Sequence, residues 1–273
     1  MIEKPCQRGE ARAFAESALA SGAVGAVTSW GSGIGHRETL RLFYDAATPG
    51  LEALLGEDLN LAEDLVEEDW GHYWRASLKP FAAGASFVLA PAWDEGRELP
   101  GTTLIRIDPG MAFGAGDHPT TRLCVACLEA LSATGFKGAR MLDVGAGTGI
   151  LALVAARLGI GPVDALDIDP FCYSSIRRNT RLNHLEPLVR PLLLSLDLLN
   201  SSYPLVVANV APNQLEAMAL TLAESVMREG LLLISGFTVD IEERLSRTFM
   251  MEFRPEKRYV EGEWIALAMR RLC

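Results

Sequence analysis

The sequence has 273 residues but no apolar run of about 18, so it predicts no membrane-spanning helix. Its five cysteines are scattered and odd in number, which argues against a disulfide framework and favours a reducing compartment. The first ten residues lack the basic and then apolar pattern of a signal peptide. The four histidines are scattered as well, without metal-ligand spacing. These absences predict a cytoplasmic protein that holds no metal.

The charge is acidic and uneven. The net charge is −10, and residues 1–96 hold 7 Lys and Arg against 15 Asp and Glu. No basic stripe is present, so direct nucleic-acid binding is not expected. The acidic first third could attract a basic partner protein by long-range steering. It could equally serve only solubility, and most acid runs such as residues 57–69 are solvated surface.

The first 108 residues predict a small unit followed by a connection. Helical spacing over 9–21 and two extended runs, 24–30 and 40–44, indicate a small α+β domain in residues 1–60. Residues 61–108 alternate short extended runs with Pro and Gly, which is typical of a linker with some strand pairing.

The rest of the chain alternates strands with helices. The predicted strands and helices, in order, are helix 123–131, strand 141–144, helix 150–158, strand 163–168, helix 171–183, strand 189–194, strand 205–208, helix 214–227 and strand 231–234. Such alternation predicts a mostly parallel, Rossmann-like sheet covered on both faces. Two further runs, 253–259 and 264–269, predict a C-terminal antiparallel hairpin. We assign residues 109–273 to one α/β domain.

A glycine-rich turn follows the first strand of this domain. Asp143 precedes Gly145, Gly147 and Gly149, which can bring the backbone close to a ligand at a helix N-terminus. Dinucleotide-binding proteins place the third glycine one position later, where this chain has Ile150. The spacing suits a nucleoside ligand without a pyrophosphate, namely S-adenosylmethionine.

Carboxylates follow the next two strands. Asp167 can accept hydrogen bonds from both ribose hydroxyls, whereas Asp169, just before Pro170, fits a helix N-cap. Asp197 could meet the adenine amino group or could be a turn residue.

Asn209 comes directly after strand 205–208, at the sheet edge where open α/β proteins bind ligands. Its amide can accept a hydrogen bond from a substrate amine and aim the nitrogen lone pair at a methyl group. The amine must be neutral, so a lysine with an ordinary pKa of about 10.4 first has to lose its proton. Asn209 is therefore predicted to be catalytic, and Phe113 is the second residue assigned to catalysis.

A second glycine-containing segment, residues 109–121, precedes the sheet. Phe113 would act as a lid on the ligand and Thr121 offers a hydroxyl at a helix start. A single histidine such as His118 is more often structural than catalytic.

Together these residues resemble the ribosomal protein L11 methyltransferase family over roughly residues 66–273. The specific part is segment 109–121, which the family writes Pro-Gly-x-Ala-Phe-Gly-x-Gly-x-His-x-Thr-Thr. The resemblance extends to Asp-Ile-Asp-Pro at 167–170, Val-Ala-Asn at 207–209 and Glu-Gly-Glu-Trp at 261–264. It implies a class I methyltransferase fold and the transfer of methyl groups from S-adenosylmethionine to lysine side chains or the N-terminal amine of ribosomal protein L11.

By position, the family's cofactor contacts fall on Thr121, Gly145, Asp167 and Asn209, and Phe113 would cover the cofactor. Two departures stand out: Val-Ala-Pro-Asn at 210–213 and an N-terminal segment whose opening strand is expected to be missing or short. Two alternatives stay open, methylation of another protein lysine or small amine, and nucleotide binding without catalysis.

Overall fold

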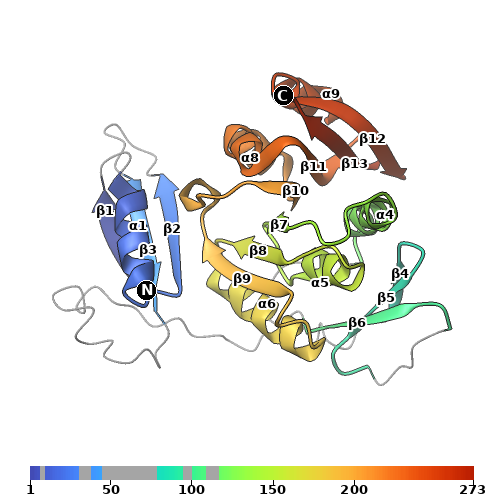
Figure 1. The fold of residues 1–273 in the computed structure, drawn as a ribbon, viewed down its shortest axis with the longest axis horizontal. Helices are drawn as coiled ribbons and strands as arrows, with labels where there is room; N and C mark the ends of the chain where they lie inside the picture. The colour runs from blue at the N-terminus through green and yellow to red at the C-terminus, as the bar shows by residue number, and fades with distance from the viewer. Residues whose placement is uncertain (7–9, 31–37, 45–78, 95–99, 109–116) are drawn as a thin grey trace.

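The computed structural model describes residues 1–6, 10–30, 38–44, 79–94, 100–108 and 117–273 (Figure 1). Its first elements are β1 (Ile2–Cys6), α1 (Glu10–Ala20), β2 (Gly25–Trp30), β3 (Glu38–Phe43), β4 (Phe81–Ala83), β5 (Phe87–Pro91) and β6 (Thr103–Ile107). The elements that follow are α4 (Pro119–Ala133), β7 (Met141–Val144), α5 (Ile150–Arg157), β8 (Val163–Asp167), α6 (Pro170–Leu182), β9 (Val189–Leu194), η2 (Leu196–Leu198), β10 (Tyr203–Asn209), α7 (Pro212–Ala217), α8 (Ala219–Ser225), β11 (Val226–Thr238), α9 (Glu242–Phe249), β12 (Phe253–Glu261) and β13 (Trp264–Arg271).

A ten-stranded sheet runs through the described part of the chain in the order β1-β3-β2-β9-β8-β7-β10-β11-β13-β12. Strands β9, β8, β7, β10 and β11 run parallel to one another. Strand β11 pairs antiparallel with β13, and β13 pairs antiparallel with β12 to form the C-terminal hairpin. All residues of β7 and β8 are buried, as expected for apolar strands covered on both faces. The predicted mostly parallel sheet with a C-terminal hairpin is confirmed.

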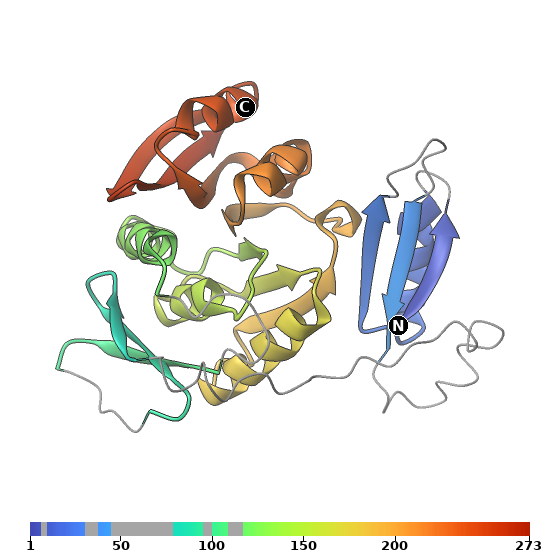
Figure 2. The same ribbon diagram turned by 180° about the vertical axis from the view of Figure 1, so that it is seen from behind.

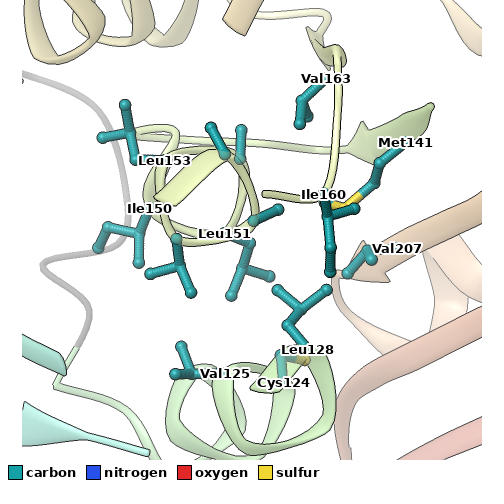
Figure 3. Packing of buried hydrophobic residues seen from close by; sticks show 14 of the residues in the cluster. Cys124, Val125, Leu128, Met141, Ile150, Leu151, Leu153, Ile160, Val163 and Val207 are labelled. Atoms are coloured by element: carbon teal, nitrogen blue, oxygen red, sulfur yellow. The ribbon is translucent and has the colours of Figure 1, made fainter. Parts of the chain in front are cut away.

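Alternating residues of the central strands feed two cores, one on each face of the sheet. On one face, Met141 and Val207 pack with α4 and α5 (Figure 3). On the other face, Leu142 and Val206 pack with α7, α8 and α9. Since side chains alternate along a strand, apolar residues at successive positions of the central strands fill the two cores in turn.

Strands β4, β5 and β6 form a small second sheet (Figure 2). Phe87, Leu89 and Ile105 from this sheet are buried in the same core as α4 and α5. The described residues of the segment expected to act as a linker, 79–94 and 100–108, therefore contribute to this core. The division at residues 60 and 108 stays a prediction.

Two expectations from sequence were wrong. The opening strand is present: β1 pairs with β3 from Ile2↔Leu42 onward, and Ile2 is buried in the N-terminal core. The helix expected at 214–227 is instead two short helices, α7 and α8, which meet at Met218, and the chain is a strand from Val226 onward. Pairing of Val226 with Tyr203 on β10 lengthens β11 and overrides the helical spacing.

The N-terminal strands extend the main sheet at its β9 edge. Strand β2 runs parallel to β9 through the pairs Gly25↔Leu193 and Ala26↔Leu194. The contact is close, because a Cβ added at Gly25 would lie 2.4 Å from Leu193 Cγ. Figures 1 and 2 show these strands at one end of the sheet and the β12–β13 hairpin at the other.

Candidate active site

The glycine turn has the predicted strand–turn–helix form between β7 and α5. Gly145 has φ of +68°, and a Cβ there would lie 2.4 Å from Val210 Cγ1, so the position needs glycine on both counts. Gly149 is the N-cap of α5 with φ of +86°, and Gly147 also has positive φ. The turn is therefore built for close backbone approach at the start of a helix.

Asp143 points into the protein. It is 1% exposed, and its Oδ2 accepts a hydrogen bond of 3.1 Å from the Ala152 amide of α5. Burial raises the pKa of this carboxyl to about 7, and the nearby Asp167 acts in the same direction. These contacts make Asp143 a brace between β7 and α5, and its predicted contact with a cofactor is untested.

Asp169 caps a helix as predicted, and the ribose contact predicted for Asp167 is untested. Asp169 is the N-cap of α6, and its Oδ1 accepts from the Phe171 amide at 2.8 Å. Asp167 ends β8, where its Oδ2 accepts from the Gly147 amide at 2.9 Å and its Oδ1 from the Asp169 amide at 3.0 Å. Burial raises the pKa of Asp167 and these backbone amides oppose the shift. The carboxylate is thus held against the glycine turn.

The strand register brings three predicted residues to one level. Val144 of β7 pairs with Leu166 of β8 and with Ala208 of β10. The next residue along each strand is Gly145, Asp167 or Asn209, so the three lie side by side at the carboxyl ends of adjacent strands. With strands about 4.8 Å apart, Asp167 and Asn209 stand about 10 Å apart on either side of the glycine turn.

Ile168, which the sequence arguments missed, lies between the two carboxylates and is 53% exposed. An apolar side chain this open beside Asp167 offers a flat contact for an aromatic base. The exposure of this side chain could not be predicted, because an isoleucine at the end of an apolar strand is expected to be buried in the core.

Helix α4 begins beside the site and is anchored to the C-terminal hairpin. His118 is its N-cap, and the His118 ring lies edge-on to Trp264 with centroids 4.3 Å apart. Arg122 donates to both oxygens of Glu261. Thr121, buried in the first turn between these anchors, is held at the helix start as predicted. Phe113 lies outside the described residues.

Asp197 lies further along the same edge, after β9. Its carboxylate accepts from Thr28 Oγ1 at 3.0 and 3.2 Å, so it contacts the N-terminal strand β2. The amide of Thr28 also donates to Ser195 Oγ at 2.8 Å. The structure thus gives Asp197 a protein partner, and its predicted contact with adenine is untested.

The described part of the chain shows neither a metal-ligand cluster nor a membrane-spanning helix. No group of three or more His, Cys, Asp or Glu there could hold a metal ion. Among the same residues, no helix is long and apolar enough to cross a membrane. A cavity of about 730 Å³ beside α6 is lined by residues that include Asp108, Arg177 and Arg181, none of them a predicted cofactor contact.

Comparison with known proteins gives consistent matches. A family model described as "Ribosomal protein L11 methyltransferase (PrmA)" matches residues 44–272. The ribosomal protein L11 methyltransferase of Trichlorobacter lovleyi is 36% identical over 236 residues, covering 84% of this chain and 73% of that protein. That of Geotalea daltonii is 34% identical over 249 residues, covering 86% and 77%. The crystal structure of a ribosomal protein L11 methylase from Lactobacillus delbrueckii subsp. bulgaricus aligns with a TM-score of 0.65 at 26% identity, covering 71% of this chain and all of that one.

Proposed function

The chain belongs to the ribosomal protein L11 methyltransferase family, and from that premise we propose that it methylates amino groups of ribosomal protein L11 with S-adenosylmethionine as the methyl donor. The amino groups would be lysine side chains, the N-terminal amine, or both. The class I methyltransferase fold expected from the sequence is confirmed, and the enzyme is a protein methyltransferase.

The observation that carries the proposal is the common level of Asp167, Gly145 and Asn209 on adjacent strands. Three groups lie in order across the sheet edge. The Asp167 carboxylate can bind a ribose, the glycine turn allows close approach of a ligand, and the Asn209 amide can bind an amine. In open α/β sheets this edge is where ligands bind.

The residues present fit an adenosyl group. Each carboxylate oxygen of Asp167 accepts one backbone amide and keeps a lone pair for a sugar hydroxyl. Ile168, exposed next to it, would pack against the adenine face. The glycine turn would lie along the rest of the ligand, with Thr121 at its far side. When bound, S-adenosylmethionine supplies an electrophilic methyl group on a sulfonium.

Asn209 would orient the nucleophile. Its carbonyl oxygen would accept a hydrogen bond from the substrate amine, which directs the nitrogen lone pair toward the methyl group. An ammonium has no lone pair, so the amine must enter neutral or lose its proton first. Once the amine is neutral, its positioning and the exclusion of water from the site are sufficient to accelerate methyl transfer. Phe113, in segment 109–121, would cover the site.

We assign recognition of L11 to the N-terminal unit, residues 1–60, whose excess of acids would complement a basic substrate. The reaction is expected in the cytoplasm, where ribosomal proteins are made, and it requires no metal, membrane or nucleic acid.

Two measurements test the proposal. Calorimetry with S-adenosylmethionine and with NAD should show binding in the micromolar range for the first only, and tight NAD binding would overturn the assignment of the cofactor. Incubation with purified L11 and labelled S-adenosylmethionine should label L11. Labelling of a different protein or a small amine in a whole-cell extract, with L11 unlabelled, would move the enzyme to another substrate.

A further inference from the structure

Helix α6 carries two buried asparagines, Asn179 and Asn183, which are 0% and 4% exposed. They lie one helical turn apart and pair with alternate residues at the end of β6. Asn183 Oδ1 accepts from the Arg106 amide at 2.9 Å, and its Nδ2 donates to the Arg106 carbonyl at 2.7 Å. Asn179 Oδ1 accepts from the Asp108 amide at 2.7 Å, and its Nδ2 donates to the Asp108 carbonyl at 3.0 Å. Each side-chain amide thus pairs with the edge of β6 as a neighbouring strand would.

The two asparagines differ in their third hydrogen bond. Asn183 Nδ2 donates to the Asn179 carbonyl at 2.8 Å, within the same helix. Asn179 Nδ2 donates instead to the Thr148 carbonyl in the glycine turn, at 2.9 Å. Thr148 is buried and directly precedes Gly149, the N-cap of α5. Of this pair, Asn179 alone therefore joins the glycine turn to Asp108, the residue before segment 109–121.

Two more contacts couple α6 to the same turn. A Cβ added at Gly149 would lie 3.4 Å from Ile176, so the turn rests directly on the helix. At the start of α6, Asp169 donates its amide to Asp167, which in turn accepts from Gly147. Helix α6 thus holds the turn at three points, through Asn179, Ile176 and Asp169, and Asn179 is the one that also reaches Asp108.

We propose that Asn179 is a positioning residue for the cofactor, because it fixes the glycine turn relative to Asp108 at the end of β6. The inference rests on the proposed function, since the glycine turn is expected to lie along bound S-adenosylmethionine. Asn179 itself contacts neither substrate nor cofactor in this account. It acts through Thr148 and Asp108.

A matched pair of variants separates positioning from simple packing. Asn179→Ala and Asn183→Ala remove the same kind of side chain and the same pair of hydrogen bonds to the backbone at the end of β6. If the asparagines only join helix to strand, both variants should change the affinity for S-adenosylmethionine equally. If Asn179 positions the turn, Asn179→Ala should weaken binding about 10-fold, because a buried carbonyl of the turn loses its donor. Asn183→Ala should then weaken binding by less than about threefold, at a similar loss of thermal stability.

Kinetics give a second readout that packing alone would not move. Asn179→Ala should raise the KM for S-adenosylmethionine and leave kcat at saturation largely unchanged, because Asn209 and the substrate amine are untouched. Equal KM values for the two alanine variants would overturn the inference.

Asn179→Asp keeps the shape and tests the hydrogen bonds directly. Its carboxylate would face the Thr148 and Asp108 carbonyls without a donor, whereas the protonated acid regains one. Relative to the wild type, binding of S-adenosylmethionine by this variant should therefore tighten as the pH falls from about 8 to about 6, since burial favours the neutral acid. Absence of that pH dependence would count against the role of the Nδ2 donor.

Amide hydrogen exchange separates failure of the inference from failure of the proposed function. Without any ligand, Asn179→Ala should speed exchange in residues 148–152 and Asn183→Ala should not. If the wild type does not bind S-adenosylmethionine, the proposed function fails, and the exchange result alone decides whether Asn179 holds the turn. Equal exchange in the two variants would overturn the inference.

Discussion

Three aspartates near the candidate site show how surroundings set the role of one residue type. Asp143 is enclosed and braces a helix, Asp169 caps a helix, and Asp167 stands at the sheet edge against the glycine turn. Burial raises the pKa of Asp143 and of Asp167. Of the three, Asp167 is the one proposed to bind a ligand, and Asp143 is expected to have the largest effect on stability.

Asp143 should make stability depend on pH. Burial raises its pKa to about 7 in the folded protein, against about 3.9 in an unfolded chain. The charged form is disfavoured by folding, so the contribution of Asp143 to stability falls as the pH rises from about 4 to about 7 and then levels off. In Asp143→Asn this dependence should disappear, so that its melting temperature falls less between about pH 5 and about pH 8 than that of the wild type. Calorimetric melting temperatures of the two proteins across this pH range test the prediction. An equal fall in melting temperature in both would show that Asp143 keeps an ordinary pKa.

Asn209 should affect turnover more than cofactor binding. Asn209→Ala removes the acceptor that would orient the amine, and we expect kcat to fall about 100-fold while the dissociation constant for S-adenosylmethionine changes by less than about threefold. Asn213, exposed in α7, offers a matched control, and Asn213→Ala should leave both constants unchanged. Steady-state kinetics with L11 and calorimetry give the two numbers. Unchanged turnover in Asn209→Ala would remove its catalytic role.

At the scale of elements, the sequence predicted those features that depend on residues close together in the chain. The strands of the parallel sheet are short and largely apolar, and the Asp169-Pro170 cap has a local mechanism, so both were predicted correctly. β1 and the long β11 depend on pairing with distant strands, which no local window contains. The bonds of Asn179 and Glu261 likewise join residues 71 and 139 positions apart. The motif Glu-Gly-Glu-Trp is visible in the sequence, but its contact with Arg122 is not.

The hairpin anchor of α4 should contribute to both stability and cofactor binding. Arg122 and Glu261 form a two-point ion pair whose side chains are 30% and 41% exposed. At that exposure, a double-mutant cycle with Arg122→Gln and Glu261→Gln should give a coupling of about 0.5–1 kcal/mol in urea unfolding. Because Thr121 lies in the same turn of α4, both single variants should also weaken S-adenosylmethionine binding about two- to fivefold. The ion pair Arg247–Glu243, exposed on α9, is the control and should leave binding unchanged.

At the scale of the whole molecule, one sheet joins the N-terminal unit to the catalytic part. Strand β2 extends the sheet beyond β9, and Thr28 donates to Asp197, which follows β9. Val27 and Phe43 pack with Leu193 of β9. A unit proposed to recognise the protein substrate is therefore in direct contact with the strand next to the carboxylate proposed to hold the ribose.

This arrangement predicts that a single glycine controls how the two parts associate. In Gly25→Val the added Cβ would lie 2.4–2.5 Å from Leu193 atoms, so β2 has to move away from β9. We expect a larger radius of gyration in small-angle scattering, faster proteolysis between the two parts and an unchanged affinity for S-adenosylmethionine, because Asp167 and the glycine turn are not altered. Thr28→Val removes the bonds to Asp197 and keeps the side-chain shape, so it should show a weaker form of the same change. A radius of gyration equal to that of the wild type in Gly25→Val would mean that the two parts are held together by contacts other than the β2–β9 pairing.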